Sequence, residues 1–163
     1  MSASDATRLP VSREDPQRVR GHLPWEATEL RLRVGRSSII ATTRPDGRPH
    51  AMAIWFCWLD GRLYFITARS TQKGGPGQDE GEGDGDEVLM VEGSTQRITD
   101  EAERARVDDA YRAKYVDPVS GATASIFDNP EDDLYRLDPS RVVTWMYGTV
   151  AGWTEWRFEP EDR

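Results

Sequence analysis

The stretch IIATTRPDGRPHAMAIWFCWLDGRLYFITARSTQK, residues 39–73, decides the fold of this chain. It contains runs rich in β-branched and aromatic residues, which favour strands. Two turns separate these runs, Pro45-Asp46-Gly47 and Leu59-Asp60-Gly61, in which Pro fixes φ or Gly accepts a positive φ after Asp. The pattern predicts an antiparallel meander. Its three strands are expected at about Ser38–Thr43, Ala51–Leu59 and Arg62–Ala68.

The meander ends in a segment rich in hydroxyls and cations, Thr67-Ala68-Arg69-Ser70-Thr71-Gln72-Lys73. Hydroxyl and backbone N–H donors beside cations can hold an anion such as a phosphate. A solvated hairpin end with a basic tail has the same composition, and from the local pattern alone it remains the alternative.

The composition indicates one globular domain with much loop. The chain has 163 residues, of which 37% are hydrophobic, 14 are Gly and 10 are Pro, and this length suits a single domain with its own core. A net charge of −8 argues against nucleic acid and against anionic membranes as partners. One cysteine, a polar N-terminus and the lack of a long apolar run predict a cytoplasmic protein without a membrane span.

Two segments are expected to be flexible. Residues 1–20 are polar and contain two prolines, which predicts a loose leader ahead of one domain over residues 21–163. The segment Gly74–Glu87, GGPGQDEGEGDGDE, has no apolar side chain that could offset the entropy of ordering it. It is therefore expected to form a flexible acidic loop inside the domain.

Two helices and further strands are expected. Pro24–Leu32 begins with a Pro suited to a first turn, whereas Asp100–Tyr115 is the clearer helix, with capping and acidic residues at its start and basic residues at its end. The apolar stripe of this second helix consists of Ala102, Val107, Ala110, Tyr111 and Tyr115. The other strands are expected at Val88–Gly93, continued by Ser94–Thr99 across a bulge or turn, and at Asp133–Leu137, Val142–Tyr147 and Trp153–Glu159.

Nucleophilic and metal chemistry find little support in the residues. Cys57 lies in an apolar run, and neither His of the chain is placed beside it to activate its thiol. The acidic run Asp79–Glu87 does not match a calcium loop, since a count from Glu80 puts Val91 where a bidentate Glu is needed. No Cys/His set suits zinc. We therefore expect no metal site and no catalytic role for Cys57.

In order along the chain, the motifs of this sequence resemble those of the flavin-binding split-barrel family, the pyridoxamine 5′-phosphate oxidase-like proteins. The resemblance extends over roughly Val34 to Phe158. It rests on the P-D-G-x-P turn in Ala41–Pro49, the V-W-F-like strand Ala53–Phe56, the D-G-x-L-Y-F hairpin Asp60–Phe65, the T-x-x-S-x-K phosphate arm Thr67–Lys73, the V-E-G-T-like strand Val91–Ser94 and the V-T-D-like turn Ile98–Asp100. The chain departs from the family after Lys73, where a short basic helix and a core strand are missing.

The resemblance implies a mainly β fold, an antiparallel split barrel of the FMN-binding type with one main helix. It further implies a homodimer with cofactor sites at the interface, and a flavin-dependent oxidoreductase that moves a hydride between FMN and a small organic substrate. A deazaflavin-dependent reductase, which would use the 8-hydroxy-5-deazaflavin coenzyme, is one alternative. The acidic loop after Lys73 disfavours its long anionic tail, so FMN leads. A non-catalytic split barrel that has weakened or lost its cofactor site is the other alternative.

The resemblance also assigns candidate residues to the cofactor. His50 to Trp55 would run beneath the flavin ring and contact it through the backbone, with a surface position at the exit of the turn as the alternative for His50. Thr67, Ser70, Thr71 and Lys73 would hold the phosphate, with Arg69 as a supporting cation. Trp55 and Trp58 are expected more in the core or a dimer interface than as stacking groups. The full candidate set is His50, Met52, Ala53, Ile54, Trp55, Ile66, Thr67, Arg69, Ser70, Thr71 and Lys73.

Overall fold

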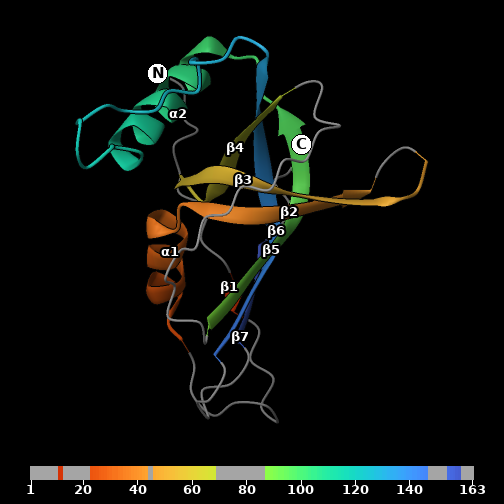
Figure 1. Cartoon of the computed structure of the whole chain (residues 1–163). Coiled ribbons are helices and arrows are strands. Elements are labelled where there is room, and N and C mark those ends of the chain that lie inside the picture. Colours follow the sequence, from red (N-terminus) through yellow and green to blue (C-terminus); the bar gives the residue numbers. More distant parts are fainter. Residues whose placement is uncertain (1–10, 13–22, 44–45, 69–86, 147–153, 159–163) are drawn as a thin grey trace, which may run out of the picture.

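The computed structural model describes residues 11–12, 23–43, 46–68, 87–146 and 154–158, which form two helices and seven strands (Figure 1). The helices are α1 (Trp25–Val34) and α2 (Glu101–Lys114). The strands are β1 (Val11–Ser12), β2 (Ser37–Thr43), β3 (Pro49–Leu59), β4 (Arg62–Ala68), β5 (Glu87–Arg97), β6 (Asp132–Met146) and β7 (Thr154–Arg157).

All strand pairs are antiparallel, and the sheet follows the order β1-β7-β6-β4-β3-β2, with β5 paired to β6. One edge of β6 pairs first with β4 and then with β7, and β5 pairs with the other edge. Figure 1 shows β2 and β3 as a long ribbon that runs across the other strands and extends beyond them. The result is a curled antiparallel half-barrel, so the expectation of a mainly β fold with this meander is confirmed.

β6 is one continuous strand, and the prediction of two strands at Asp133–Leu137 and Val142–Tyr147 is wrong. Pro139 has no N–H, but it lies between the β4 and β7 ladders, where that edge of β6 has no described strand partner. The β5 edge continues past it through an irregularity between Glu92 and Gly93. A Cβ on Gly93 would stand 2.1 Å from the carbonyl oxygen of Asp138, so this close approach requires glycine.

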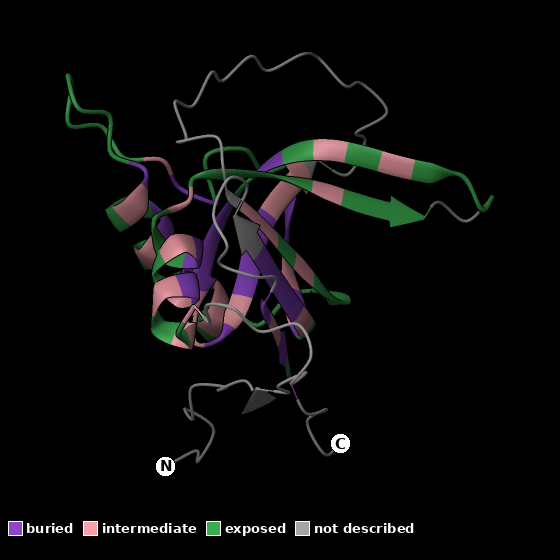
Figure 2. Ribbon diagram, turned by 90° about the horizontal axis from the view of Figure 1, so that it is seen from below, coloured by how far each residue is buried: buried purple, intermediate pink, exposed green. Residues whose placement is uncertain are grey.

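Two apolar clusters join the helices to the sheet (Figure 2). Under α2, the cluster includes Val107, Tyr111 and Tyr115, each at most 3% exposed. Under α1, Leu32 packs with the phenylalanines of β3 and β4. The predicted stripe of α2 is therefore confirmed for these three residues, but Ala102 is exposed and does not belong to it.

The expected hairpin turn at Asp60-Gly61 and the expected cap of the second helix are confirmed. Asp60 and Gly61 have φ values of 52° and 72°, as a two-residue hairpin turn requires. Asp100 caps α2 by accepting from the Glu103 N–H at 2.8 Å. Val11 and Ser12, within the expected leader, pair with β7, and Glu87, the last residue of the expected acidic loop, is the first residue of β5. The flexibility of both segments stays a prediction. Residues 74–86 lie outside the described residues.

Candidate cofactor site

The ladder between β3 and β4 ends part of the way along both strands, at the pair Phe56↔Phe65. Beyond this pair β4 stays paired with β6, and β3 stays paired with β2. The facing edges of Pro49–Trp55 in β3 and Ile66–Ala68 in β4 therefore have no strand partner in the described part of the chain. We refer to these two facing edges as the split.

The phenol hydroxyl of Tyr111, on α2, lies where the ladder ends. It donates to the carbonyl oxygen of Trp55 at 2.8 Å and accepts a hydrogen bond from the backbone of Ile66. Trp55 and Ile66 are the residues that the register would pair next. The hydroxyl therefore takes the place of a strand-to-strand hydrogen bond and holds β3 and β4 apart at the start of the split.

Two further side chains of α2 hold the β3 backbone at the next residue. The Tyr115 hydroxyl lies 2.6 Å from the carbonyl oxygen of Phe56 and 2.9 Å from its N–H, and it also contacts the carbonyl oxygen of Arg36. The Lys114 ammonium donates to the same Phe56 oxygen at 2.9 Å. α2 thus fixes β3 at the junction between its β2 ladder and its β4 ladder.

Burial sets the protonation of these groups. It raises the pKa of Tyr111 well above its usual value and raises the pKa of Tyr115 to about 12, so both phenols keep their protons at neutral pH. Burial lowers the pKa of Lys114 to about 8, and the nearby Arg36 cation adds to this effect. Lys114 is still mostly charged at pH 7, where it serves as a donor to the β3 backbone.

One face of the β2–β3 ribbon is exposed along its described length, as the green bands of Figure 2 show. Trp55 is 50% exposed at the α2 end of this face, and its indole stacks on the Tyr115 ring with 5.1 Å between centroids and 10° between planes. The rest of the face carries mostly small or apolar side chains. We call it the ribbon face, and it consists of Ser37, Ile39, Ala41, Thr43, Pro49, Ala51, Ala53 and Trp55.

The other predicted residues of β3 lie on the opposite face of the ribbon. Ile54 is buried, and His50 and Met52 are half-buried. The Thr67 hydroxyl of β4 donates to Sδ of Met52 at 3.8 Å, a weak contact that crosses the split. The structure thus brings the backbones of Trp55 and Ile66 and the side chains of Met52 and Thr67 together at the split, whereas the side chains of Ala53 and Trp55 lie on the ribbon face.

The remaining predicted phosphate ligands, Arg69, Ser70, Thr71 and Lys73, lie outside the described residues. The T-x-x-S-x-K arm begins at Thr67, at the end of β4, so this first member places the start of the arm beside the split.

Trp58 and Cys57 belong to the core. Trp58 is 5% exposed, and its indole N–H donates to Oε1 of Glu29 at 3.2 Å. The expectation of a core position is confirmed for Trp58, whereas Trp55 is half exposed. Burial raises the pKa of the Cys57 thiol to about 12, so the thiol is protonated at neutral pH and is not poised as a nucleophile.

Three residues of this site were missed by sequence reasoning: Tyr111, Lys114 and Tyr115. The spacing of the two tyrosines, four residues apart on one helix face, signalled burial and was correctly assigned to the core. The spacing does not predict which backbone groups the two hydroxyls contact. Lys114 was assigned to the C-terminal end of the helix for its charge, and its contact with β3 depends on how α2 packs.

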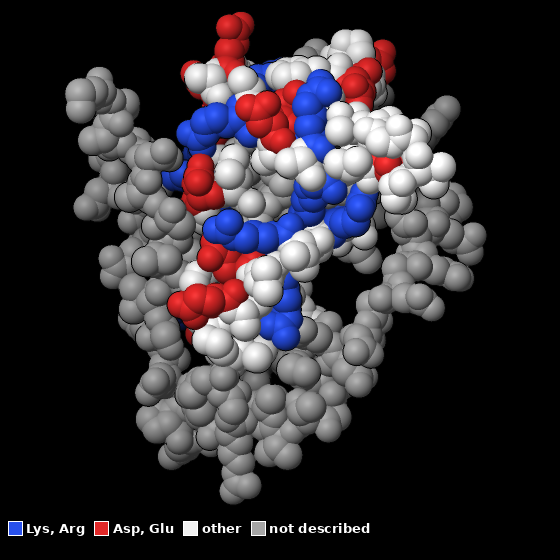
Figure 3. All heavy atoms as spheres, turned by 90° about the vertical axis from the view of Figure 1, so that its left-hand side faces the viewer, with Lys and Arg blue, Asp and Glu red and all other residues white. Residues whose placement is uncertain are grey.

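Charges are mixed on the face that α1 and α2 share, where Figure 3 shows basic and acidic side chains side by side. Arg106 pairs with Asp60 at 2.7 Å and Arg33 with Glu29 at 3.0 Å. Within the described residues, no group of three or more His, Cys, Asp or Glu side chains is arranged to hold a metal ion. None of the described helices is long and apolar enough to cross a membrane.

Comparison of the sequence with known families gives one match. The family model described as pyridoxamine 5′-phosphate oxidase matches residues 26–146. No curated protein matches the chain. Similar solved structures include General Stress Protein 26 from Bacillus anthracis str. Sterne (19% identity, covering 67% of this chain and 83% of that chain, TM-score 0.42).

Two others are a pyridoxamine 5′-phosphate oxidase-related, FMN-binding protein from Nostoc punctiforme PCC 73102 (17% identity, 85% and 98% covered, TM-score 0.43) and PhzG from Burkholderia lata 383 in complex with tetrahydrophenazine-1-carboxylic acid (17% identity, 83% and 89% covered, TM-score 0.45). These likenesses are distant. The family model, in contrast, covers most of the sequence, and the chain belongs to the pyridoxamine 5′-phosphate oxidase family.

Proposed function

We propose that this protein is an FMN-dependent oxidoreductase whose cofactor lies against β3 at the split. The observation that carries the proposal is the edge of Pro49–Trp55, which has no strand partner on the β4 side in the described part of the chain. Members of the family generally bind FMN, and the V-W-F-like strand that would contact the flavin ring is this part of β3.

The residues at the split fit such a group. A flavin ring has hydrogen-bond donors and acceptors on one side, which can pair with the backbone N–H and C=O groups of a strand edge. Tyr111 holds the opening in place through the Trp55 carbonyl. The bound cofactor would supply the hydride chemistry. The chain would supply orientation through β3 and a phosphate site through Thr67 and the arm that follows it.

We further propose that the active form is a homodimer assembled on the ribbon face. This face combines exposed Ile39 (73%) and Trp55 (50%) with alanines and small polar residues. An exposed surface of this kind, on a ribbon that extends beyond the other strands, is suited to a second copy of the chain. Its position on the same strand as the split would place the partner subunit beside the cofactor.

Titration with FMN tests the cofactor assignment. The purified protein would be examined for a flavin absorption band and then titrated with FMN while the tryptophan fluorescence is followed. We expect saturable quenching, because Trp55 is half exposed beside the split, together with reduction and reoxidation of the bound flavin. Absence of a flavin band and of quenching would overturn the proposal and favour a non-catalytic barrel. The same titration with 8-hydroxy-5-deazaflavin coenzyme decides between the two cofactors.

The assembly proposal has its own test, sedimentation equilibrium of the wild type and of an Ile39→Glu variant. We expect a dimer that the buried charge of the variant dissociates. Ser38→Glu, on the adjacent position and the opposite face of β2, is the matched control. A monomeric wild type would contradict the assembly proposal and leave the FMN titration to be judged by itself.

A further inference from the structure

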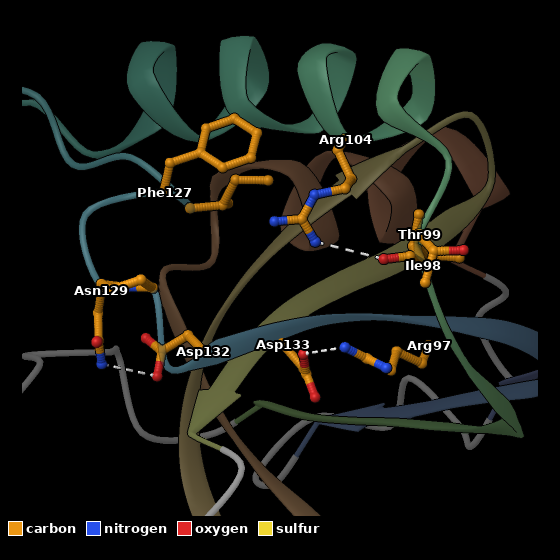
Figure 4. A pocket seen from close by; sticks show the side chains of 10 residues that line it. Arg97, Ile98, Thr99, Arg104, Phe127, Asn129, Asp132 and Asp133 are labelled. Carbon is orange, nitrogen blue, oxygen red and sulfur yellow. Dashed lines mark hydrogen bonds and ion pairs between the residues drawn. The ribbon is translucent and has the colours of Figure 1, made fainter.

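A cavity of about 350 Å³ lies between the start of α2, the segment of residues 126–130 and the adjoining ends of β5 and β6 (Figure 4). Ligand sites in proteins have volumes of this order. None of the residues that line it belongs to the candidate cofactor set. We call it the α2 cavity.

Most charged groups of the α2 cavity have partners. Arg97 pairs with Oδ1 of Asp133 at 2.8 Å, and the Asp133 side chain is buried. The Asn129 amide donates to Oδ1 of Asp132 at 3.0 Å. These contacts hold the acidic wall of the cavity in place, as the dashed lines in Figure 4 show.

Arg104 differs from these groups. Among the described residues, its guanidinium forms no ion pair, and its hydrogen bond to the carbonyl oxygen of Ile98 is long, at 3.4 Å. A guanidinium carries five N–H donors, so most of its capacity is unused. Figure 4 shows the side chain extending from α2 into the cavity.

The ring of Phe127 stands beside this cation. The guanidinium carbon of Arg104 lies 5.0 Å from the ring centroid, and Phe127 is 50% exposed. An exposed aromatic ring next to a cation with unused donors matches a ligand with an anionic end and an apolar body. Asp108 fixes this wall, because its carboxylate accepts from the Ile126 N–H at 2.9 Å and from the Ser125 hydroxyl.

We propose that the α2 cavity binds a small organic monocarboxylate, with the carboxylate on Arg104 and the apolar body against Phe127. Arginine binds carboxylates through two parallel hydrogen bonds, which suits this geometry. A dianion such as a phosphate monoester is disfavoured, because the carboxylates of Asp132 and Asp133 line the same cavity. The proposal is independent of FMN binding at the split.

Benzoate is the probe for this site, measured by isothermal titration calorimetry on the full chain without added flavin. We expect saturable binding of benzoate and at least about tenfold weaker binding of benzamide, which has the same ring without the charge. Phenyl phosphate, a dianion, should also bind more weakly than benzoate. Failure of benzoate to bind, or equal affinity for benzamide, overturns the proposal.

Two variants on the same helix locate the binding. Arg104→Gln should weaken benzoate at least about tenfold. Arg106→Gln, which removes the same charge from a surface pair with Asp60, should leave the affinity within about twofold. Equal effects of both variants would show a general charge effect and contradict the site.

Amide chemical shifts of the wild type serve if Arg104→Gln fails to fold. Benzoate should shift the amides of Ile98, Thr99 and Phe127 and leave those of Met52 to Trp55 unchanged. Shifts confined to β3 would place benzoate at the split and overturn the proposal. FMN binding at the split should persist with benzoate bound, so that failure of one site is distinguished from failure of the other.

Discussion

The Tyr111 hydroxyl donates to the carbonyl oxygen of Trp55 at 2.8 Å, at the step where the β3–β4 ladder stops. A side chain from a helix thus takes over a bond that a neighbouring strand would otherwise make. The opening between the strands is for this reason a built feature of the fold, since the backbone groups at its start are satisfied by Tyr111 and Tyr115.

Tyr111→Phe removes this hydroxyl while keeping the ring. The variant leaves the Trp55 carbonyl and the Ile66 N–H without their partner, and an unsatisfied buried group costs about 1–3 kcal/mol. We expect the free energy of unfolding, measured by urea denaturation, to fall by that amount, and FMN binding to weaken.

Tyr135→Phe is the matched control for this change. Tyr135 stacks on Phe65, so the substitution makes the same chemical change in an aromatic residue close to β4. We expect a change in unfolding free energy within about 0.5 kcal/mol. Equal losses in the two variants would mean that the Tyr111 hydroxyl has no special part in holding the split.

Lys114 predicts a dependence of stability on alkaline pH. Its pKa is lowered to about 8 in the folded protein by burial, whereas an unfolded lysine titrates near about 10.4. Between these values the unfolded chain binds more protons, so stability rises with pH over that window. We expect the wild type to gain stability relative to Lys114→Met from pH 8 to pH 10 in urea unfolding. Parallel curves for the two proteins would contradict this.

Asp108 predicts a dependence of stability on acidic pH. Burial alone would raise its pKa, but hydrogen bonds from Ser125, Arg112 and Ile126 outweigh this and lower it. The stability that the charged Asp108 carboxylate contributes is present above the unfolded pKa of about 3.9. It is lost as pH falls through the lower pKa of the folded state.

We therefore expect Asp108→Asn to lower the free energy of unfolding by about 1.5–3 kcal/mol at pH 7, with the difference from wild type shrinking below pH 4. The neighbouring Asp109→Asn, at an exposed position of α2, is the control and should change little. A loss that stays constant down to pH 2 would show that the Asp108 charge contributes nothing.

Much of the fold follows from local sequence signals. The Asp60-Gly61 turn, the cap at Asp100 and the strand composition each specify their own conformation, so the meander and both helices were predicted. The continuity of β6 was not predicted, because it depends on which edge of the strand has a partner at Pro139. This is decided by how β4, β5 and β7 pair with β6, and the residues near Pro139 do not specify it.

The candidate site divides in the same way. Trp55, Ile66 and Thr67 were predicted because their motif is local, and the structure places them at the split. The residues that hold the split lie more than 50 positions away in sequence from Trp55, on α2. Their hydroxyl and ammonium groups reach β3 only through tertiary packing. The predicted helical stripe therefore indicated that the tyrosines are buried, but not where their hydroxyls point.

The phosphate arm gives the last prediction, which rests on its T-x-x-S-x-K motif. Lys73→Ala should weaken FMN binding by about 1.5–3 kcal/mol, the value of a lost charged hydrogen bond. Gln72→Ala is the matched control, and riboflavin, which has no phosphate, should bind both variants and the wild type equally. Fluorescence titration measures all of these affinities. If riboflavin loses as much affinity as FMN in Lys73→Ala, the lysine acts on the ring site and the phosphate assignment is wrong.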